Sequence, residues 1–316
     1  MARCFVTRVL PGDALGRLAA SHDVDVWEGD LPPPRRALLE GARDAEGLLS
    51  LLTDHLDAEL FDSCPRLRVV ANMAVGTDNI DLDEASRRGI AVGNSPGVLT
   101  ETTADLAFAL ILATARRLIE AADAVRSGTW RTWEPAGWLG FDVHGATLGI
   151  VGSGEIGLAV ARRGAGFSME VLLNGREPAP DRVPLDELLA RADFVSVHTP
   201  LTAETRGLIG ERELRAMKPT AVLVNTARGE IVEAEALRIA LDRGWIAGAG
   251  LDVTDPEPLP ADHPLLGAPN LTVLPHIGSA SHATREAMAA IAVDNLLAAL
   301  AGKAMPHPVV PASPRK

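Results

Sequence analysis

Residues 146–163 constrain the fold more than any other stretch, because a short apolar run is followed at once by closely spaced glycines and a helical pattern. The run Ala146 to Val151 has strand length, Gly152, Gly154 and Gly157 come directly after it, and small and apolar residues then recur at helical spacing. This order predicts a strand, a tight turn and a helix, with one glycine for the turn, one for the close approach of a pyrophosphate and one for packing of helix on strand. The helix N-terminus adds N–H donors for a phosphate. The stretch predicts a dinucleotide site, although such glycines are also typical of an ordinary strand–helix turn.

Length and composition predict a two-domain globular protein. The 316 residues exceed the usual length of one domain, and 47% apolar with 23% charged residues is enough for two cores. The net charge of -12 argues against a nucleic-acid partner and an anionic membrane surface, since both require clustered Lys and Arg. Cys4 and Cys64 have neither metal nor disulfide spacing. With no signal peptide and no apolar stretch long enough to span a bilayer, we expect a cytoplasmic protein.

Strand-like and helix-like segments alternate along both halves of the chain, which is typical of parallel sheets with crossover helices. The expected strands are Phe5–Val9, Val24–Trp27, Gly47–Leu51, Leu67–Asn72, Ile90–Gly93, Ala146–Val151, Glu170–Leu173, Phe194–His198, Ala221–Thr226, Ala247–Val253 and Leu271–Leu274. The predicted fold class is therefore α/β, with two doubly wound parallel-sheet domains.

Two apolar helices set the expected domain boundaries. Thr100 to Leu118 is apolar on nearly every face, which predicts a buried helix that links the domains. Ala283 to Leu300 predicts a long helix that returns the chain to the first domain. We therefore expect a discontinuous, flavodoxin-like first domain of residues 1–99 and 284–316, and a Rossmann dinucleotide-binding domain of residues 100–283.

The residues after the second strand of the Rossmann domain bear on the choice of cofactor. An NAD enzyme usually carries an acid there, about twenty residues past the first glycine, for the ribose 2′-hydroxyl. This chain has Asn174, Gly175 and Arg176 instead, and Arg176 with Asn174 beside it would attract a 2′-phosphate. We predict NADPH as the preferred cofactor and NADH as the alternative. The competing interpretation is that Arg176 is an ordinary solvated arginine.

Three charged residues follow three different strands of the same domain. Arg228, Glu257 and His276 lie past the carboxyl ends of their strands, where open parallel sheets bind ligands. Each alone is more often a surface charge, a loop acid or a packed histidine. Together they fit hydride reduction of a 2-keto acid: His276 donates the proton, Arg228 holds the carboxylate, and Glu257 orients and favours the imidazolium. No third ligand stands at a matching interval from His276 and His282, so no metal site is predicted.

Five ordered motifs in the chain have the spacing of a known family. They are V-G-T-D-N-I-D from Val75, G-S-G-E-I-G from Gly152, V-N-T-A-R-G from Val224, G-L-D-V-T-D-P-E-P-L-P from Gly250 and L-P-H-I-G-S-A from Leu274. On these motifs the whole chain resembles the D-isomer-specific 2-hydroxyacid dehydrogenase family, most closely its glyoxylate/hydroxypyruvate reductases. The resemblance implies an NAD(P)-dependent oxidoreductase that reduces small 2-keto acids to D-2-hydroxy acids, with Arg228, Glu257 and His276 as the catalytic trio and a first domain that covers the substrate.

The resemblance also assigns residues to the substrate and the cofactor. Val75 and Gly76 correspond to the loop whose backbone N–H groups bind the substrate carboxylate, together with Arg228 and His276. The expected cofactor set is Gly152, Gly154, Glu155, Ile156, Gly157, Asn174, Gly175, Arg176, Thr199, Pro200, Thr226, Ala227, Arg228, Asp252, His276 and Gly278. Glu155 departs from the family, because many members carry arginine or another non-acidic residue there, and an acid beside a phosphate lowers affinity by repulsion.

Residues 128–141 have neither helical nor strand periodicity and contain Trp130, Trp133 and Trp138. These tryptophans either anchor a loop on the core or form a subunit interface. Because family members are commonly dimers through the cofactor domain, the resemblance implies a homodimer in which Trp138 lies near the partner's substrate pocket.

Two kinds of alternative function remain. One is a different substrate within the family, as in the phosphoglycerate, D-lactate and phosphite dehydrogenases. The other is a non-catalytic protein that binds a dinucleotide as a signal, since some relatives use this fold in regulation.

Overall fold

The computed structural model describes residues 1–176 and 179–310, and the chain divides into two compact units. Unit 1 comprises Met1–Leu99 and the residues from Ser279 onward, and unit 2 comprises Thr100–Gly278. Both have a wholly parallel sheet, so the predicted α/β class with two parallel-sheet domains is confirmed. The second boundary falls at 278/279 rather than at the expected 283/284, because the chain changes unit in the loop before the C-terminal helix and not within that helix.

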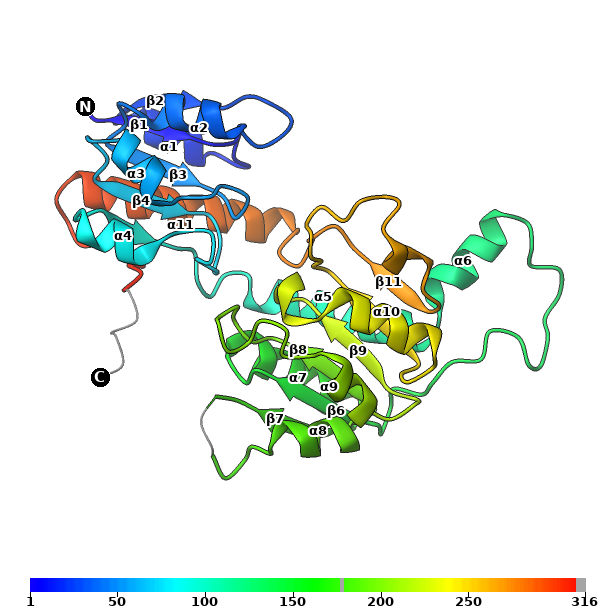
Figure 1. Cartoon of the computed structure of the whole chain (residues 1–316). Coiled ribbons are helices and arrows are strands. Elements are labelled where there is room, and N and C mark those ends of the chain that lie inside the picture. The colour runs from blue at the N-terminus through cyan, green and yellow to red at the C-terminus, as the bar shows by residue number, and fades with distance from the viewer. Residues whose placement is uncertain (177–178, 311–316) are drawn as a thin grey trace. The chain divides into compact units, whose positions relative to one another are not determined.

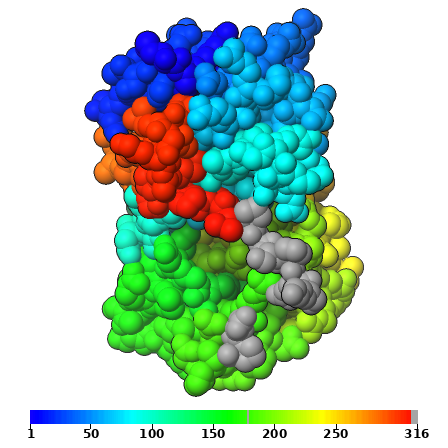
Figure 2. Space-filling view, turned by 90° about the vertical axis from the view of Figure 1, so that its left-hand side faces the viewer, coloured from blue at the N-terminus to red at the C-terminus, as the bar shows by residue number. Residues whose placement is uncertain are grey.

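Unit 1 is built on a five-stranded sheet in the order β2-β1-β3-β4-β5, the flavodoxin-like order. Its elements are β1 (Arg3–Val6), α1 (Ala14–Ala19), β2 (Asp23–Val26), α2 (Arg35–Ala42), β3 (Gly47–Ser50), α3 (Ala58–Ser63), β4 (Val69–Asn72), α4 (Leu82–Arg87), β5 (Ala91–Gly93) and α11 (His282–Leu300). Helix α11 packs on α1, β3 and β4 (Figure 1), and its red and orange side chains lie against the blue N-terminal ones in Figure 2. Segments from both ends of the chain therefore share one core.

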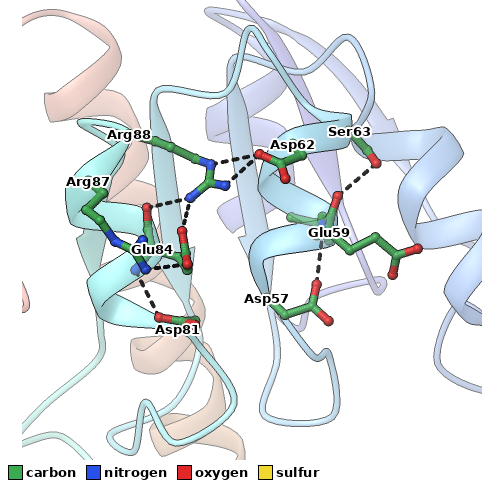
Figure 3. A network of polar contacts seen from close by, with 9 residues as sticks. Asp57, Glu59, Asp62, Ser63, Asp81, Glu84, Arg87 and Arg88 are labelled. Atoms are coloured by element: carbon green, nitrogen blue, oxygen red, sulfur yellow. Dashed lines mark hydrogen bonds and ion pairs between the residues drawn. The ribbon is translucent and has the colours of Figure 1, made fainter.

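Hydrogen bonds and ion pairs cap helices α3 and α4 and connect them to each other (Figure 3). Asp57 caps α3 and Asp81 caps α4 by accepting backbone N–H groups at 3.0 and 2.9 Å. Arg88 then joins the helices, because Nη2 lies 2.6 Å from Asp62 Oδ1 while Nη1 contacts Glu84. Most of this network is solvent-exposed, so it orients the helices more than it stabilises the unit.

Unit 2 is built on a six-stranded sheet in the order β11-β10-β9-β8-β6-β7. Its elements are α5 (Thr100–Ala115), α6 (Leu118–Arg126), β6 (Thr147–Val151), α7 (Glu155–Gly166), β7 (Glu170–Asn174), α8 (Leu185–Arg191), β8 (Phe194–Val197), α9 (Glu211–Ala216), β9 (Val222–Asn225), the 3₁₀ turn η1 (Gly229–Ile231), α10 (Ala234–Asp242), β10 (Gly248–Leu251), the 3₁₀ turn η2 (Pro264–Gly267) and β11 (Leu271–Val273). Strand β7 is added on one side of β6, and β8, β9, β10 and β11 are added on the other side, so the direction of strand addition reverses between β6 and β8. Sheets of this kind bind ligands at the carboxyl ends of the strands beside the reversal.

Two apolar cores sandwich the sheet of unit 2. Helices α5 and α7 pack together over one face, and α8, α9 and α10 cover the other (Figure 1). Strands β8, β9 and β10 are buried along their whole length, because helices cover both faces and strands flank both sides. The sheet is therefore a rigid platform whose exposed functional part is its carboxyl edge.

The helix expected over Thr100 to Leu118 is too long. Helix α5 ends at Ala115, Arg117 adopts a left-handed conformation with φ 51°, and α6 begins a new direction. The reason is that Arg116 and Arg117 end the apolar pattern, and Arg116 is exposed. Helix α6 and the following loop extend away from the rest of unit 2 (Figure 1).

Both cysteines are buried, and burial raises the pKa of the Cys4 and Cys64 thiols to about 11. Each is therefore protonated at neutral pH and is no nucleophile. Within the described residues, the structure contains no helix with the length and apolar character needed to cross a membrane.

Candidate active site

The glycine turn after β6 lies at the strand reversal and is shaped by direct backbone contact. Gly152 has φ 100°, and a Cβ there would lie 2.6 Å from Thr199 N and 2.7 Å from His198 C. The turn after β6 therefore sits directly against the turn after β8. A Cβ at Gly157 would lie 2.1 Å from Gly152 O, so α7 approaches the turn as closely as a glycine allows.

Gly154 differs from its neighbours, because a Cβ there would meet no protein atom within 4 Å. Its φ of -79° is also ordinary, so neither packing nor backbone conformation requires glycine. Gly154 is the N-cap of α7, whose first N–H groups form an anion site. The open space at this residue fits the close approach of a pyrophosphate, so the turn fits a dinucleotide.

Glu155, the residue that departs from the family pattern, begins α7. Its Oε2 accepts a hydrogen bond from Thr100 Oγ1 at 3.2 Å. A carboxylate in the first turn stabilises a helix by its interaction with the helix dipole. The hydrogen bond also joins the first residue of α7 to the first residue of α5. Glu155 thus has a structural role that is independent of any ligand.

The carboxyl end of β7 is joined to the glycine turn through Asn174. Its backbone oxygen accepts from Gly152 N and Ser153 N, both at 3.1 Å. Its side-chain Nδ2 donates to Val183 O at 3.0 Å. This bond uses one of the two N–H donors of the Asn174 amide, whereas the Arg176 side chain is exposed.

His276 and Glu257 form a close pair across two loops of unit 2. His276 Nδ1 lies 2.6 Å from Glu257 Oε1, and the side chains are 23% and 35% exposed. At this distance the ring donates a charge-assisted hydrogen bond through Nδ1. The carboxylate fixes the orientation of the imidazole and leaves Nε2 as the ring nitrogen available to a ligand.

Asp252 fixes the backbone that carries His276. Its carboxylate accepts from Ile277 N and Gly278 N, both at 2.7 Å, while its backbone oxygen accepts from His276 N at 2.8 Å. Burial raises the pKa of Asp252, although the two N–H groups and His276 favour its ionised form. His276 itself has φ 54°, so the loop is held in a conformation that few side chains adopt.

Arg228 follows β9, and its loop packs tightly on the loop after β10. Asn225 Nδ2 donates to Arg228 O at 2.8 Å, and Asn225 Oδ1 accepts from Ala227 N at 3.0 Å. A Cβ at Gly229 would lie 2.0 Å from Thr254 O, so no side chain fits between the loops. The half-buried Arg228 donates through Nη1 to Ala227 O at 2.7 Å.

A polar chain that the sequence did not reveal runs through His198. Its Nε2 lies 2.8 Å from Ser196 Oγ, and its Nδ1 lies 3.4 Å from Thr226 Oγ1. Burial lowers the pKa of His198 to about 3, so the imidazole is neutral. His198 thus connects the turn after β8 to Thr226, a member of the expected cofactor set. The only hint in the sequence was its place at the end of a strand.

Comparison with known proteins agrees with this arrangement. The family described as "D-isomer specific 2-hydroxyacid dehydrogenase, NAD binding domain" matches residues 108–278. A glyoxylate reductase from Korarchaeum cryptofilum (strain OPF8) is 51% identical over 314 residues, which cover 96% of this chain and 95% of that protein. The chain belongs to the D-isomer-specific 2-hydroxyacid dehydrogenase family. It is therefore an NAD(P)-dependent oxidoreductase, and unit 2 contains its NAD-binding domain.

Solved structures of relatives share the fold. A protein from Thermus thermophilus superposes with a TM-score of 0.93 at 52% identity, covering 98% of this chain and 100% of that one. The NADPH-dependent glyoxylate/hydroxypyruvate reductase from Sinorhizobium meliloti, solved in complex with NADP and malonate, superposes with a TM-score of 0.86 at 35% identity, covering 100% of this chain and 99% of that one. The predicted family and fold are confirmed.

The expected site residues of this dehydrogenase divide between its two units. Apart from Trp138, those of unit 2 lie at or just past the carboxyl ends of its strands or begin α7. Val75 and Gly76 lie in unit 1 after β4, where Asn94 Nδ2 donates to Val75 O at 2.8 Å and Asn72 Nδ2 donates to Gly76 O at 3.0 Å. These bonds hold the loop through its carbonyls.

Trp138 belongs to the exposed loop after α6 and is 44% exposed. Arg117 Cζ lies 5.6 Å from its ring centroid, a cation–π contact within unit 2. The described residues contain no group of three or more His, Cys, Asp or Glu side chains that could hold a metal ion.

Proposed function

We propose that the protein is an NADPH-preferring reductase of small 2-keto acids, which converts glyoxylate to glycolate and hydroxypyruvate to D-glycerate. The observation that carries the proposal is the 2.6 Å pair of His276 and Glu257, on the same sheet edge as the glycine turn and Arg228. It is supported by the relatives, which include glyoxylate reductases and an NADPH-dependent glyoxylate/hydroxypyruvate reductase.

Each residue of the trio has a distinct task in the proposed reaction. The bound dinucleotide supplies the hydride that the carbonyl carbon accepts. His276 Nε2 donates a proton to the carbonyl oxygen, where negative charge would otherwise develop. Glu257 stabilises the imidazolium before the transfer and keeps Nε2 in position. Arg228 pairs with the substrate carboxylate through its planar guanidinium, which explains how an acidic protein binds an acid.

Two further groups are proposed to bind substrate and cofactor. The backbone N–H groups of Val75 and Gly76 bind the substrate carboxylate, from a loop whose carbonyls are already bonded to asparagines. Arg176 binds the 2′-phosphate of NADPH, supported by its position after the second strand of the dinucleotide-binding sheet.

We also propose a homodimer through unit 2. Trp133 is 78% exposed, and exposed apolar side chains cluster on α6 and the loop after it: Leu118, Ile119, Val125, Trp130, Trp138 and Leu139. A cluster of this kind, rich in tryptophan, is typical of a buried interface rather than of free surface. In this proposal Trp138 reaches the partner's substrate pocket.

A substrate panel tests the function directly. Glyoxylate, hydroxypyruvate, pyruvate and phosphite are each assayed with the NADP and NAD forms of the cofactor. We expect the highest kcat/KM for glyoxylate and hydroxypyruvate with NADPH. A protein that binds NADPH but turns over none of the four substrates would instead be a dinucleotide-sensing protein, and the proposal would be wrong.

A further inference from the structure

We propose that Ser153 and Arg182 bind the 2′-phosphate of NADPH and so determine cofactor specificity. Neither residue belongs to the expected cofactor set. The inference rests on the proposed NADPH preference and adds to it the groups that bind the 2′-phosphate.

Three segments meet at the carboxyl ends of β6 and β7: the glycine turn with Ser153, the end of β7 with Gly175, and the segment that contains Arg182. A Cβ at Gly175 would lie 2.7 Å from Ser153 Oγ, 3.0 Å from Arg182 Nη1 and 3.1 Å from Arg182 Cζ. The hydroxyl and the guanidinium therefore both lie where a side chain at Gly175 would stand. Gly175 is not among the residues with positive φ, so its glycine is explained by this close approach and not by the turn.

Arg182 is held in place by pairing of its backbone with the end of β7. Leu173 and Arg182 form a parallel bridge, and Val183 N donates to Leu173 O at 2.8 Å. Asn174 Nδ2 donates to Val183 O at 3.0 Å, which locks the same segment from its other side. Arg182 is half-buried, whereas Arg176 is exposed. Because the Arg182 side chain is less exposed and starts from a fixed backbone, its binding to a ligand loses less side-chain entropy than binding by Arg176.

The chemistry of this position distinguishes the two nicotinamide cofactors. The end of the second strand is where a dinucleotide-binding sheet meets the ribose 2′ position. A guanidinium makes two parallel hydrogen bonds to a phosphate that is itself charged, but only a single, weaker hydrogen bond to an uncharged hydroxyl. The Ser153 hydroxyl adds a donor from the glycine turn itself. In a chain with a net charge of -12, such local donors are needed to bind an additional phosphate.

Adenosine fragments test the inference without the reaction. We would titrate the full-length protein with 2′,5′-ADP and 5′-AMP by calorimetry, using wild type, Arg182→Gln, Arg182→Lys and Ser153→Ala. Arg212→Gln is the control, because Arg212 is an exposed arginine of unit 2 that pairs with Asp186. We expect Arg182→Gln to weaken 2′,5′-ADP binding by at least about tenfold with 5′-AMP unchanged. Arg182→Lys should recover part of the loss, and Ser153→Ala should show a smaller one.

The ratio of the two affinities separates this inference from the proposed function. Binding of 5′-AMP by each variant also shows that the site is folded. If wild type prefers 2′,5′-ADP and Arg182→Gln keeps the same ratio, the role of Arg182 is wrong while NADPH preference stands. If wild type binds both fragments equally, the proposed NADPH preference is itself wrong, and the inference falls with it.

Discussion

His276 Nδ1 lies 2.6 Å from Glu257 Oε1, although the residues are 19 positions apart and sit in different loops. The contact determines which ring nitrogen is available, because Nδ1 is occupied and only Nε2 can serve a substrate. Asp252 reinforces the geometry by holding the two N–H groups that follow His276. The proposed proton donor therefore has a fixed direction within unit 2.

Glu257→Gln should lower kcat for glyoxylate reduction at saturating NADPH. The amide keeps the shape of the side chain but not its charge, so it holds the His276 ring less firmly and stabilises positive charge on it less. We expect kcat to fall by about tenfold with the affinity for NADPH unchanged, while Glu235→Gln, which removes an exposed carboxylate of α10, should leave kcat in place. A wild-type kcat in Glu257→Gln would contradict the pairing role.

Arg228→Gln should act mainly on substrate binding. Losing a charge-assisted pair with the substrate carboxylate should raise the KM for glyoxylate by roughly tenfold to a hundredfold at saturating NADPH. Arg228→Lys keeps the charge but lacks the planar guanidinium, so its KM for glyoxylate should lie between those of wild type and Arg228→Gln. Steady-state kinetics with both variants measures this, and equal KM values for Gln, Lys and wild type would refute the assignment.

His198 should make unit 2 sensitive to acid. Its folded pKa of about 3 is depressed below the unfolded value of about 6.5, so between these values the unfolded chain binds the extra proton. Stability from this source is complete above about pH 6.5 and is lost as pH falls toward 3. Calorimetry should show a smaller drop in Tm from neutral to mildly acidic pH in His198→Gln than in wild type. The exposed His144→Gln serves as the control, and an equal drop in all three proteins would show that His198 does not contribute.

Trp133→Ser should weaken the proposed homodimer. The side chain is 78% exposed, so its loss removes little from the core of unit 2 but much from an interface. Light scattering after size exclusion should show a dimer for wild type and more monomer for the variant at low concentration. Val9→Ser, an exposed apolar position of unit 1, should remain like wild type. A wild-type protein that is monomeric at all concentrations would exclude the dimer.

The sheet architecture and the family could be predicted from the sequence, because strand periodicity, the glycine turn and the ordered motifs are all local patterns. The end of α5 could not be predicted, because it depends on the left-handed backbone conformation of Arg117 between two apolar stretches. It also missed Arg182 beside Gly175 and the hydrogen bonds of His198, since these contacts depend on how a loop returns to a strand end. Residue type indicated the proposed proton donor, but only the folded loops show what orients it.

The most direct test of the account is the kcat of His276→Ala for glyoxylate reduction with saturating NADPH, measured beside the affinity of the variant for NADPH. We expect kcat to fall by at least about a hundredfold through loss of the proton donor, with NADPH still bound. A variant that binds NADPH and turns over glyoxylate at near the wild-type rate would contradict the central claim.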